Sequence, residues 1–360
     1  MTEIWILGAT GRIGRQVAAN LAAAQVSPVL VGRDSVRLRE LARSIGGDPR
    51  IVEAGSVDAV VAELSRNAPA VVVNTIGPFT ETALPIARAC QPGTHYVDMA
   101  NEFRAVAAIL DLHREAADAD RSFVTGAGFG VLATESVLMQ VCEGEPAPSR
   151  VRVDAVASVA TEPGVIGSAL ASSVLDGVSF GGRRIEYGRL TRSQLGAEPA
   201  RLTTPDGDAV VTGSAPTAEL LAAWRASKAD SVVAASIAAP TKLAARLVVP
   251  AVSAVLRVPG VARFGARRLA RVSVKARDMP RRHSWGHARV EWPSGASREG
   301  WLRAGDGMDF TAAVAAEVAL RLARGEGSPG AYTPGALFGP EVAIAAGGEF
   351  LIDGAAASVG

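Results

Sequence analysis

Three glycines near the start of the chain restrict its fold more than any other feature. In "EIWILGATGRIGRQV" (3–17), the apolar run Ile4–Leu7 ends at Gly8, and Gly11 and Gly14 follow at intervals of three. A helix-like pattern begins at once. A strand that turns sharply into a helix needs residues without Cβ, so that phosphate can approach the backbone and the helix can pack on the strand. The spacing predicts a nucleotide-phosphate turn, and a purely structural turn is the alternative.

The first 130 residues alternate regularly between apolar runs and amphipathic segments. Such alternation predicts a doubly wound parallel sheet, an α/β fold whose strand ends meet at one edge, where ligands bind. We expect strands at 4–7, 28–33, 50–55, 70–77, 95–100 and 122–128, and helices at 12–24, 36–45, 57–66, 80–90 and 102–119.

A second, α+β domain is expected from 131 to 305. The stretch 150–160 alternates like a half-exposed strand, and "RRIEYGRL" and "SWGHARVEW…SREGWLRAG" are typical of antiparallel hairpins. A helix rich in small residues is expected to start near Gly164, with its N-terminus available to an anionic group. A strongly periodic helix is expected at 308–325.

The residues after the second strand bear on the choice of dinucleotide. NAD-binding sheets usually place an acid there, about 20 residues past the glycines, for the ribose 2′-hydroxyl. This chain has Gly32 and Arg33, and Asp34 follows. A guanidinium suits a 2′-phosphate, and Arg12 is a second candidate for it, so we expect NADP(H). Asp34 leaves NAD open. Asp58, after the third strand, either borders the adenine or belongs to a solvated helix start.

Two later loops are expected to carry the nicotinamide half and the substrate. In "NTIGPF" (74–79), Asn74 is expected to fix the loop, and Thr75, Ile76 and Gly77 to contact the ribose. Phe79 is expected to face the substrate. "YVDMANE" (96–102) brings Asp98 and Glu102 to the same edge. A reduction that forms an anion needs a general acid. The candidates are Asp98 and Glu102, with Tyr96 and Tyr187 as further ones.

Several motifs together resemble the saccharopine dehydrogenase-like oxidoreductases. They are "GATGRIG", "VGRD", "NTIGPF…ALPIARAC", "GTHYVDMANE", "GAGFGV" and the tail "AYTPGALFGPE". The resemblance implies a Rossmann domain of residues 1–130, completed by 306–360, with a substrate domain between. It also implies NADP(H)-dependent reduction of an imine or of a carrier-bound C=C bond. By position, the residues that match the group's cofactor contacts are Gly8, Thr10, Gly11, Arg12, Ile13, Arg33, Thr75 and Gly77.

One stretch departs from the pattern of that group. In "GAGFGVLATES" (126–136), Gly130 stands where an aspartate is common and Ala133 where a proline is. Phe129 and Gly130 are the expected substrate contacts in this loop.

Composition excludes several other classes. The net charge is +1, so nothing drives the whole chain toward nucleic acid. Two cysteines and four histidines support neither a disulfide framework nor a metal site. The N-terminus has no secretory signal pattern, and a cytoplasmic location is expected. Segment 257–282 carries nine Lys/Arg and one acid, which predicts either a solvated helix pair or contact with a membrane or a carrier protein. A homodimer is left open.

The expected function is therefore an NADPH-dependent reductase that transfers hydride to a C=C or C=N bond of a small or carrier-bound, apolar substrate. The cofactor supplies the hydride chemistry, and the protein orients it. The alternative is a non-catalytic redox sensor that binds NADP(H) and regulates a partner.

Overall fold

The computed structural model describes residues 3–90, 92–165, 168–256, 258 and 260–352. Its first sheet has seven parallel strands in the order β17-β6-β5-β4-β1-β2-β3. Their bounds are β1 Ile4–Leu7, β2 Val29–Gly32, β3 Ile51–Glu53, β4 Val71–Asn74, β5 His95–Asp98, β6 Ser122–Val124 and β17 Gly330–Tyr332. The strand order reverses between β1 and β4. The predicted doubly wound sheet is confirmed.

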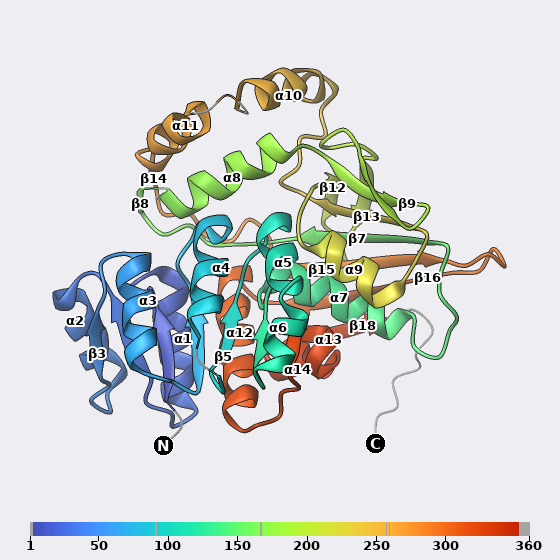
Figure 1. Ribbon diagram of the computed structural model, residues 1–360. Coiled ribbons are helices and arrows are strands. Elements are labelled where there is room, and N and C mark those ends of the chain that lie inside the picture. Colours follow the sequence, from blue (N-terminus) through green and yellow to red (C-terminus); the bar gives the residue numbers. More distant parts are fainter. Residues whose placement is uncertain (1–2, 91, 166–167, 257, 259, 353–360) are drawn as a thin grey trace.

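Helices cover both faces of this sheet (Figure 1). One face packs on α1 (Arg12–Ala23), α2 (Ser35–Ile45) and α12 (Gly307–Ala323). The other face packs on α3 (Val57–Arg66), α4 (Phe79–Ala89), α5 (Phe103–Leu110) and α6 (His113–Asp118). The prediction of one helix over 102–119 is wrong, because the chain leaves the helix at Asp111 and begins a new one after Leu112. Leu112 lies between helices α5 and α6, and its side chain is buried in the apolar cluster on this face of the sheet.

The second sheet is mostly antiparallel and has nine strands. Seven run in the order β10-β9-β13-β7-β15-β16-β18, and a β11–β12 hairpin joins at β13. The bounds are β7 Arg150–Val156, β9 Arg183–Glu186, β10 Arg189–Arg192, β11 Ala200–Thr203, β12 Ala209–Ser214, β13 Ser231–Ser236, β15 Ser284–Glu291, β16 Ser297–Ala304 and β18 Glu349–Ile352. The two predicted hairpins are present as β9–β10 and β15–β16.

A buried helix joins the two sheets. Helix α7 (Phe129–Val141) follows β6 of the first sheet and packs on β15 and β16 of the second. A Cβ on Gly286 of β15 would lie 2.7 Å from Ala133 Cβ on α7, so the glycine lets helix and strand meet closely. One core of buried side chains runs through both sheets. The C-terminal part of the chain contributes to both sheets, because β17 pairs in the first and β18 in the second. The division into two domains at residues 130 and 305 stays a prediction. Helices α9 (Glu219–Ser227), α13 (Pro334–Phe338) and α14 (Glu341–Ala345) pack around α7.

The remaining elements form a layer above the carboxyl edge of the first sheet (Figure 1). Helix α8 (Ser168–Phe180) packs against both α10 (Leu243–Leu256) and α11 (Val261–Ala270). The helix predicted to start near Gly164 starts later, because Gly164–Val165 form β8 and pair with β14 (Ser273–Val274). Over the described part of the chain, no helix is both long and apolar enough to cross a membrane.

Candidate functional site

The glycine turn has the geometry that its spacing predicted. Gly8 has φ of +77°, and the backbone N–H groups of Gly8 and Ala9 both donate to the carbonyl of Val31, at 2.9 and 3.0 Å. A Cβ on Gly14 would lie 2.5 Å from the carbonyl oxygen of Gly8. The first glycine therefore permits the left-handed turn, and the third lets α1 pack directly on it.

The start of α1 is suited to an anion. Gly11 is the N-cap and offers no side-chain acceptor, and the first turn of a helix leaves its N–H groups without intrahelical partners. Arg12, Ile13 and Gly14 contribute these N–H groups at the positive end of the helix. A groove with a cavity of about 360 Å³ lies beside the turn, lined by Thr10, Arg15, Arg37, Glu40, Leu41 and Ser44.

The two residues directly after β2 differ in their contacts: one is an exposed cation and the other caps a helix. Arg33 is exposed and forms no ion pair with any residue that the structure describes. The Asp34 carboxylate accepts the backbone N–H groups of Val36 and Arg37, both at 3.1 Å, and so caps α2. Asp58 is exposed in the first turn of α3, where Ser56 is the N-cap.

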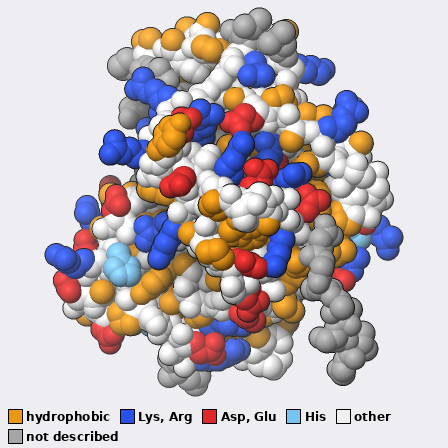
Figure 2. Space-filling view, turned by 90° about the vertical axis from the view of Figure 1, so that its right-hand side faces the viewer, with side chains coloured by type: hydrophobic (Ala, Val, Ile, Leu, Met, Phe, Trp, Pro, Cys, Tyr) orange, Lys and Arg blue, Asp and Glu red, His pale blue; other side chains and the backbone are white. Residues whose placement is uncertain are grey.

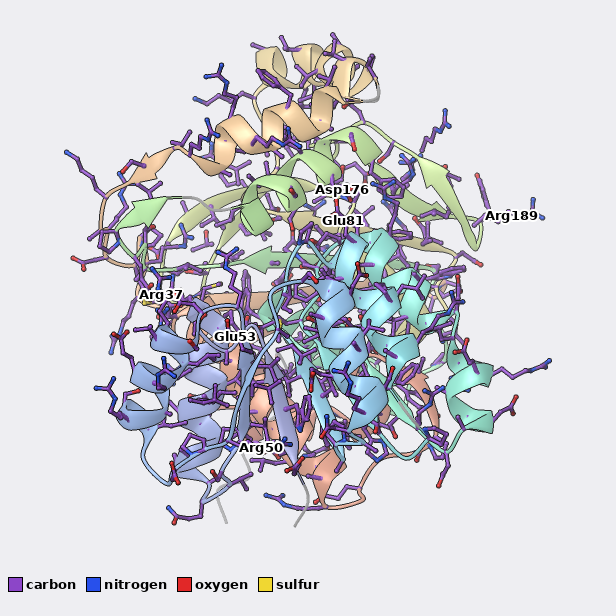
Figure 3. The ribbon with its side chains drawn as sticks, turned by 60° about the vertical axis from the view of Figure 1, so that its left-hand side comes forward. Arg37, Arg50, Glu53, Glu81, Asp176 and Arg189 are labelled. Carbon is purple, nitrogen blue, oxygen red and sulfur yellow. The ribbon has the colours of Figure 1, made fainter. Side chains whose placement is uncertain are left out.

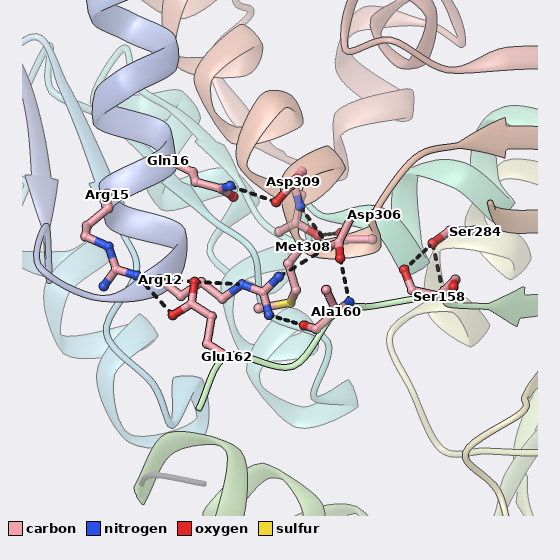
Figure 4. A network of polar contacts seen from close by, with 12 residues as sticks. Arg12, Arg15, Gln16, Ser158, Ala160, Glu162, Ser284, Asp306, Met308 and Asp309 are labelled. Carbon is pink, nitrogen blue, oxygen red and sulfur yellow. Dashed lines mark hydrogen bonds and ion pairs between the residues drawn. The ribbon is translucent and has the colours of Figure 1, made fainter. Parts of the chain in front are cut away.

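Arg12 lies in a network that ties the glycine turn to the segment after β7 and to the start of α12 (Figure 4). Its Nη1 donates to the carbonyl of Ala160 at 2.6 Å, and Nη2 lies 3.5 Å from Asp306 Oδ1. Its Nε lies 3.6 Å from Glu162, which also pairs with Arg15 at 3.1 Å. Asp306 in turn caps α12 and accepts the N–H of Ala160. These contacts engage the guanidinium of Arg12, the second candidate for a 2′-phosphate after Arg33.

The loop after β4 is fixed against the turn by side chains. Thr75 Oγ1 donates to the carbonyl of Leu7 at 2.7 Å, and Asn74 Oδ1 accepts the N–H of Ile76 at 3.0 Å. Asn74 Nδ2 also donates to Tyr96 Oη at 3.1 Å. A Cβ on Gly8 would lie 2.8 Å from Thr75 Oγ1. The structure thus brings Gly8, Thr75 and Ile76 together, with Gly77 next in the chain.

Asp98 is fully buried and holds two strand ends together. Its Oδ1 accepts from Ala100 N (3.0 Å), Thr125 Oγ1 (2.8 Å) and Gly126 N (3.1 Å). Burial raises the pKa of Asp98, and these hydrogen bonds oppose that rise. Burial likewise raises the pKa of the enclosed Tyr96 hydroxyl well above its usual value. Both groups lie inside the fold at the end of β5.

The other predicted residues lie at different depths. Glu102 is half-buried at the start of α5 and accepts a hydrogen bond from Ser173 of α8. Phe79 begins α4 and packs against two apolar clusters, and Phe129 is buried against Phe310. Tyr187 is 87% exposed in the turn between β9 and β10, so the structure does not bring it to the sheet edge.

A buried carboxylate that the sequence reasoning missed lies against Gly130. A Cβ at position 130 would be 2.1 Å from Glu219 Oε1, and Glu219 is 3% exposed. The side-chain amide of Asn101, with its nitrogen and oxygen assigned from their hydrogen-bond partners, donates to Glu219 Oε2 at 2.7 Å. Burial raises the pKa of Glu219. Because Asn101 follows β5 and Gly130 follows β6, this carboxylate lies at the carboxyl edge of the sheet. The sequence signal for this buried carboxylate was Gly130 itself, which stands where the saccharopine dehydrogenase-like group commonly has an aspartate.

Helix α8 lies over this edge and is tied to α5. Arg104 of α5 pairs with Asp176 of α8, and Glu102 pairs with Ser173. Figure 3 shows Asp176 above Glu81 of α4, and Arg37 at the left, lower than both and on the side of β2 and β3. The edge between the glycine turn and α8 is therefore covered by the second part of the chain.

Across the described ranges, no group of three or more His, Cys, Asp or Glu could hold a metal ion. His287, four residues from His283, is buried in β15, and its Nδ1 lies 3.0 Å from Asp154 Oδ2.

Comparison with known proteins bears on both the fold and the sequence. No family model matches the chain. The trans-acting enoyl reductase of Mycobacterium ulcerans (strain Agy99) is 33% identical over 141 residues, which is 37% of this chain and 34% of that protein. The trans-acting enoyl reductase of Mycobacterium leprae (strain TN) is 31% identical over 147 residues, or 39% and 35%. The alignments thus span about a third of the length of these curated relatives.

A solved structure matches along nearly the whole chain. Apo saccharopine dehydrogenase (L-Glu forming) from Saccharomyces cerevisiae superposes with a TM-score of 0.58 at 13% identity, covering 98% of this chain and 100% of that one. An identity this low supports a statement about fold alone. The chain therefore has the two-sheet fold of saccharopine dehydrogenase, and over part of its length its sequence is similar to trans-acting enoyl reductases.

Proposed function

We propose that this protein is an NADPH-dependent reductase that transfers hydride to a C=C or C=N bond of an apolar substrate. The observation that carries the proposal is the first turn of α1, whose N–H groups receive no hydrogen bond from a capping side chain. This turn follows a tight glycine turn at the point where the strand order reverses. Ligands of open α/β sheets bind outside the carboxyl ends of the strands at such a point. The dehydrogenase and reductase names of the similar proteins favour the same activity.

The residues present fit a dinucleotide. The first-turn N–H groups of α1 would hold the pyrophosphate, and the loop Thr75–Gly77, fixed by Asn74, would lie along the nicotinamide ribose. The adenine half would lie toward β2 and β3. When bound, the nicotinamide supplies the hydride.

Arginine side chains on the adenine side favour the phosphorylated dinucleotide. Arg33 is exposed just after β2, and Arg15 and Arg37 line the groove beside the turn. Asp34 uses its carboxylate to cap α2, which leaves it less suited to a ribose 2′-hydroxyl. Guanidinium groups bind phosphate through paired, charge-assisted hydrogen bonds. We therefore propose that Arg33 and Arg37 bind the 2′-phosphate of NADPH, while Arg12 anchors the fold.

We propose Glu219 as the residue that holds the proton needed for the reduction. Adding a hydride to one atom of a double bond requires a proton for the other, or for an enolate that forms first. Glu219 lies at the ends of β5 and β6, on the nicotinamide side, and burial favours its protonated form. Asp98 is less suited, because its Oδ1 is engaged three times and the side chain has no exposed surface. Glu102 remains a second candidate.

The side chains and the helix at the carboxyl edge of the first sheet bear on the class of substrate. Phe79 follows the loop after β4 and Phe129 follows the loop after β6, and α8 lies over the same edge of the sheet (Figure 1). These aromatic side chains favour an apolar substrate over a charged one. The curated relatives are named for enoyl reduction, which favours a C=C bond on a carrier-bound chain over an imine. The division into a cofactor domain (1–130 with 306–360) and a substrate domain (131–305) is part of this proposal.

The test is turnover. We would follow NADPH absorbance with the purified protein, using medium- and long-chain enoyl thioesters in one set and 2-oxo acids mixed with amino acids in the other. Oxidation of NADPH by an enoyl thioester supports the proposal. Oxidation only with imine-forming mixtures would move the substrate to the C=N class. Tight NADPH binding without turnover in either set would favour the non-catalytic sensor.

A further inference from the structure

The helix pair α10–α11 turns apolar side chains outward. On α10, Val248, Val252 and Val255 are 59%, 42% and 56% exposed, and their spacing of four and three residues places them on one helix face. Val258, at 51%, and Phe264 of α11, at 61%, extend the same apolar set. Figure 2 shows hydrophobic side chains along the top of the molecule, where these helices lie, with basic ones beside them.

The inner side of the pair is already used for packing. Ser253 Oγ donates to the carbonyl of Val178 on α8 at 2.7 Å. A Cβ on Gly265 of α11 would lie 3.2 Å from Leu175 Cδ1, also on α8. The helices are therefore held to the body by one side. Isolated exposed valines are common, but four large apolar side chains on two adjacent helices, with Val258 between the helices, form a surface that folding itself leaves uncovered.

Cations border this apolar surface on the side of α11. Arg267, Arg268, Arg271, Lys275 and Arg277 are all exposed, and the sequence contains no Asp or Glu between Asp230 and Asp278. The Arg268 guanidinium lies 5.4 Å from the centre of the Phe264 ring. None of the five pairs with an acid within the described ranges. A one-sided apolar stripe with a basic border is the pattern of helices that lie in the surface of an anionic bilayer.

We propose that α10 and α11 dock this protein on an anionic lipid surface. The valines and Phe264 would enter the boundary between headgroups and acyl chains, and the five cations would lie against lipid phosphates. Helix α10 has 14 residues and contains Pro250, too short a span to cross a bilayer, so the pair lies in the plane of the surface. An acidic protein would satisfy the cations but not the wide apolar set. This inference is independent of the cofactor and of the reaction.

The experiment is flotation of the purified chain with two kinds of vesicle. One kind is phosphatidylcholine alone, and the other contains equal parts of phosphatidylcholine and phosphatidylglycerol. We expect binding to the anionic vesicles that weakens as salt rises, and at least tenfold weaker binding to phosphatidylcholine. Because each cation near such a surface is worth about fivefold in affinity, Arg267→Gln/Arg268→Gln/Arg271→Gln should lower the partition coefficient about a hundredfold.

Control variants elsewhere on the protein show whether a loss of vesicle binding is specific to the α10–α11 surface. Val248→Ser/Val252→Ser/Val255→Ser should lower binding to anionic vesicles at least tenfold. Ile344→Ser, 55% exposed on α14, should leave binding unchanged, as should Arg39→Gln/Arg43→Gln/Arg114→Gln on α2 and α6. Circular dichroism and the unfolding midpoint show that each variant is folded. Equal binding by the helix-pair variants and their controls would overturn the proposal. So would failure of the wild type to float, or self-association that buries the helix pair instead.

Discussion

The carboxylate of Glu219 fills the space in front of Gly130, so that a Cβ at position 130 would lie 2.1 Å from Glu219 Oε1. The two residues come from α9 and α7, which belong to distant parts of the sequence. Their contact places a buried acid at the ends of β5 and β6, where the sequence reasoning expected an acid from β5 itself.

A methyl group at position 130 should displace that acid. Gly130→Ala should lower the free energy of unfolding by about 1–2 kcal/mol, since the methyl pushes Glu219 from its hydrogen bond with Asn101. Urea unfolding measures the change. Gly177→Ala is the matched control, because it is also helical and its Cβ would meet nothing within 4 Å. The shorter acid in Gly130→Ala/Glu219→Asp should recover part of the loss, and equal losses at 130 and 177 would refute the steric account.

Removing the ionisable group at position 219 should change the pH dependence of the reaction. With Glu219 as the proton holder, wild-type kcat falls as the pH rises and the carboxyl group loses its proton. Glu219→Gln should lower kcat about 10²–10⁴-fold with little change in KM, and should flatten the profile. Glu102→Gln is the companion variant. A profile unchanged by Glu219→Gln but flattened by Glu102→Gln would reassign the role to Glu102.

Glu135 should make the stability of the fold depend on pH. This carboxylate of α7 accepts from Thr333 and from the N–H of Gly335, and burial raises its pKa to about 7. Because the folded protein holds this proton more tightly than the unfolded chain, the stability present below about pH 4.5 is lost as the pH rises to about 7. The contribution is on the order of 3 kcal/mol.

Urea unfolding at pH 5, 6, 7 and 8 measures this dependence. Glu135→Gln should show a smaller fall in stability over that range than the wild type. Glu81→Gln, an exposed glutamate on α4, should fall like the wild type. Identical slopes for the Glu135 variant and the wild type would contradict the assignment.

Arg12 should act on stability more than on the choice of dinucleotide. Arg12→Ala removes the hydrogen bond to Ala160 and the contact with Asp306, and should cost about 1–3 kcal/mol of unfolding free energy. It should weaken NADPH and NADH binding by similar factors. Thermal unfolding and titration with both dinucleotides distinguish the two roles. A selective loss of NADPH affinity would restore Arg12 as a 2′-phosphate ligand.

The sequence predicted six of the seven strands of the first sheet, because the signals of those strands are local. The three-residue strand β17 was missed, because so short a run carries no periodicity. The apolar runs end at turn residues, and Gly8 and Gly14 each have a steric explanation. The break at Leu112 was missed, because both halves of 102–119 have helical periodicity and only tertiary packing separates them. The contacts of Arg12 could not be predicted either, because its partners Ala160 and Asp306 lie far along the chain.

The candidate acid was harder to predict for the same reason. Asp98 and Glu102 directly follow a strand and so attract attention, whereas Glu219 begins a helix in the second part of the chain. Only packing against Gly130 distinguishes it from other helix-start glutamates. Arg37 likewise looks like any surface arginine until the groove beside Thr10 and Arg15 is seen.

Dinucleotide binding at the glycine turn tests the account most directly. We would titrate NADPH and NADH, by fluorescence, into the wild type, Arg33→Ala, Arg37→Ala and the control Arg43→Ala, which lies on α2 outside the groove. We expect the wild type to bind NADPH more tightly than NADH. In the first two variants we expect NADPH affinity to fall about ten- to hundredfold, corresponding to about 1.5–3 kcal/mol, with NADH affinity and the control unchanged. A wild-type protein that binds neither dinucleotide would contradict the proposed cofactor site.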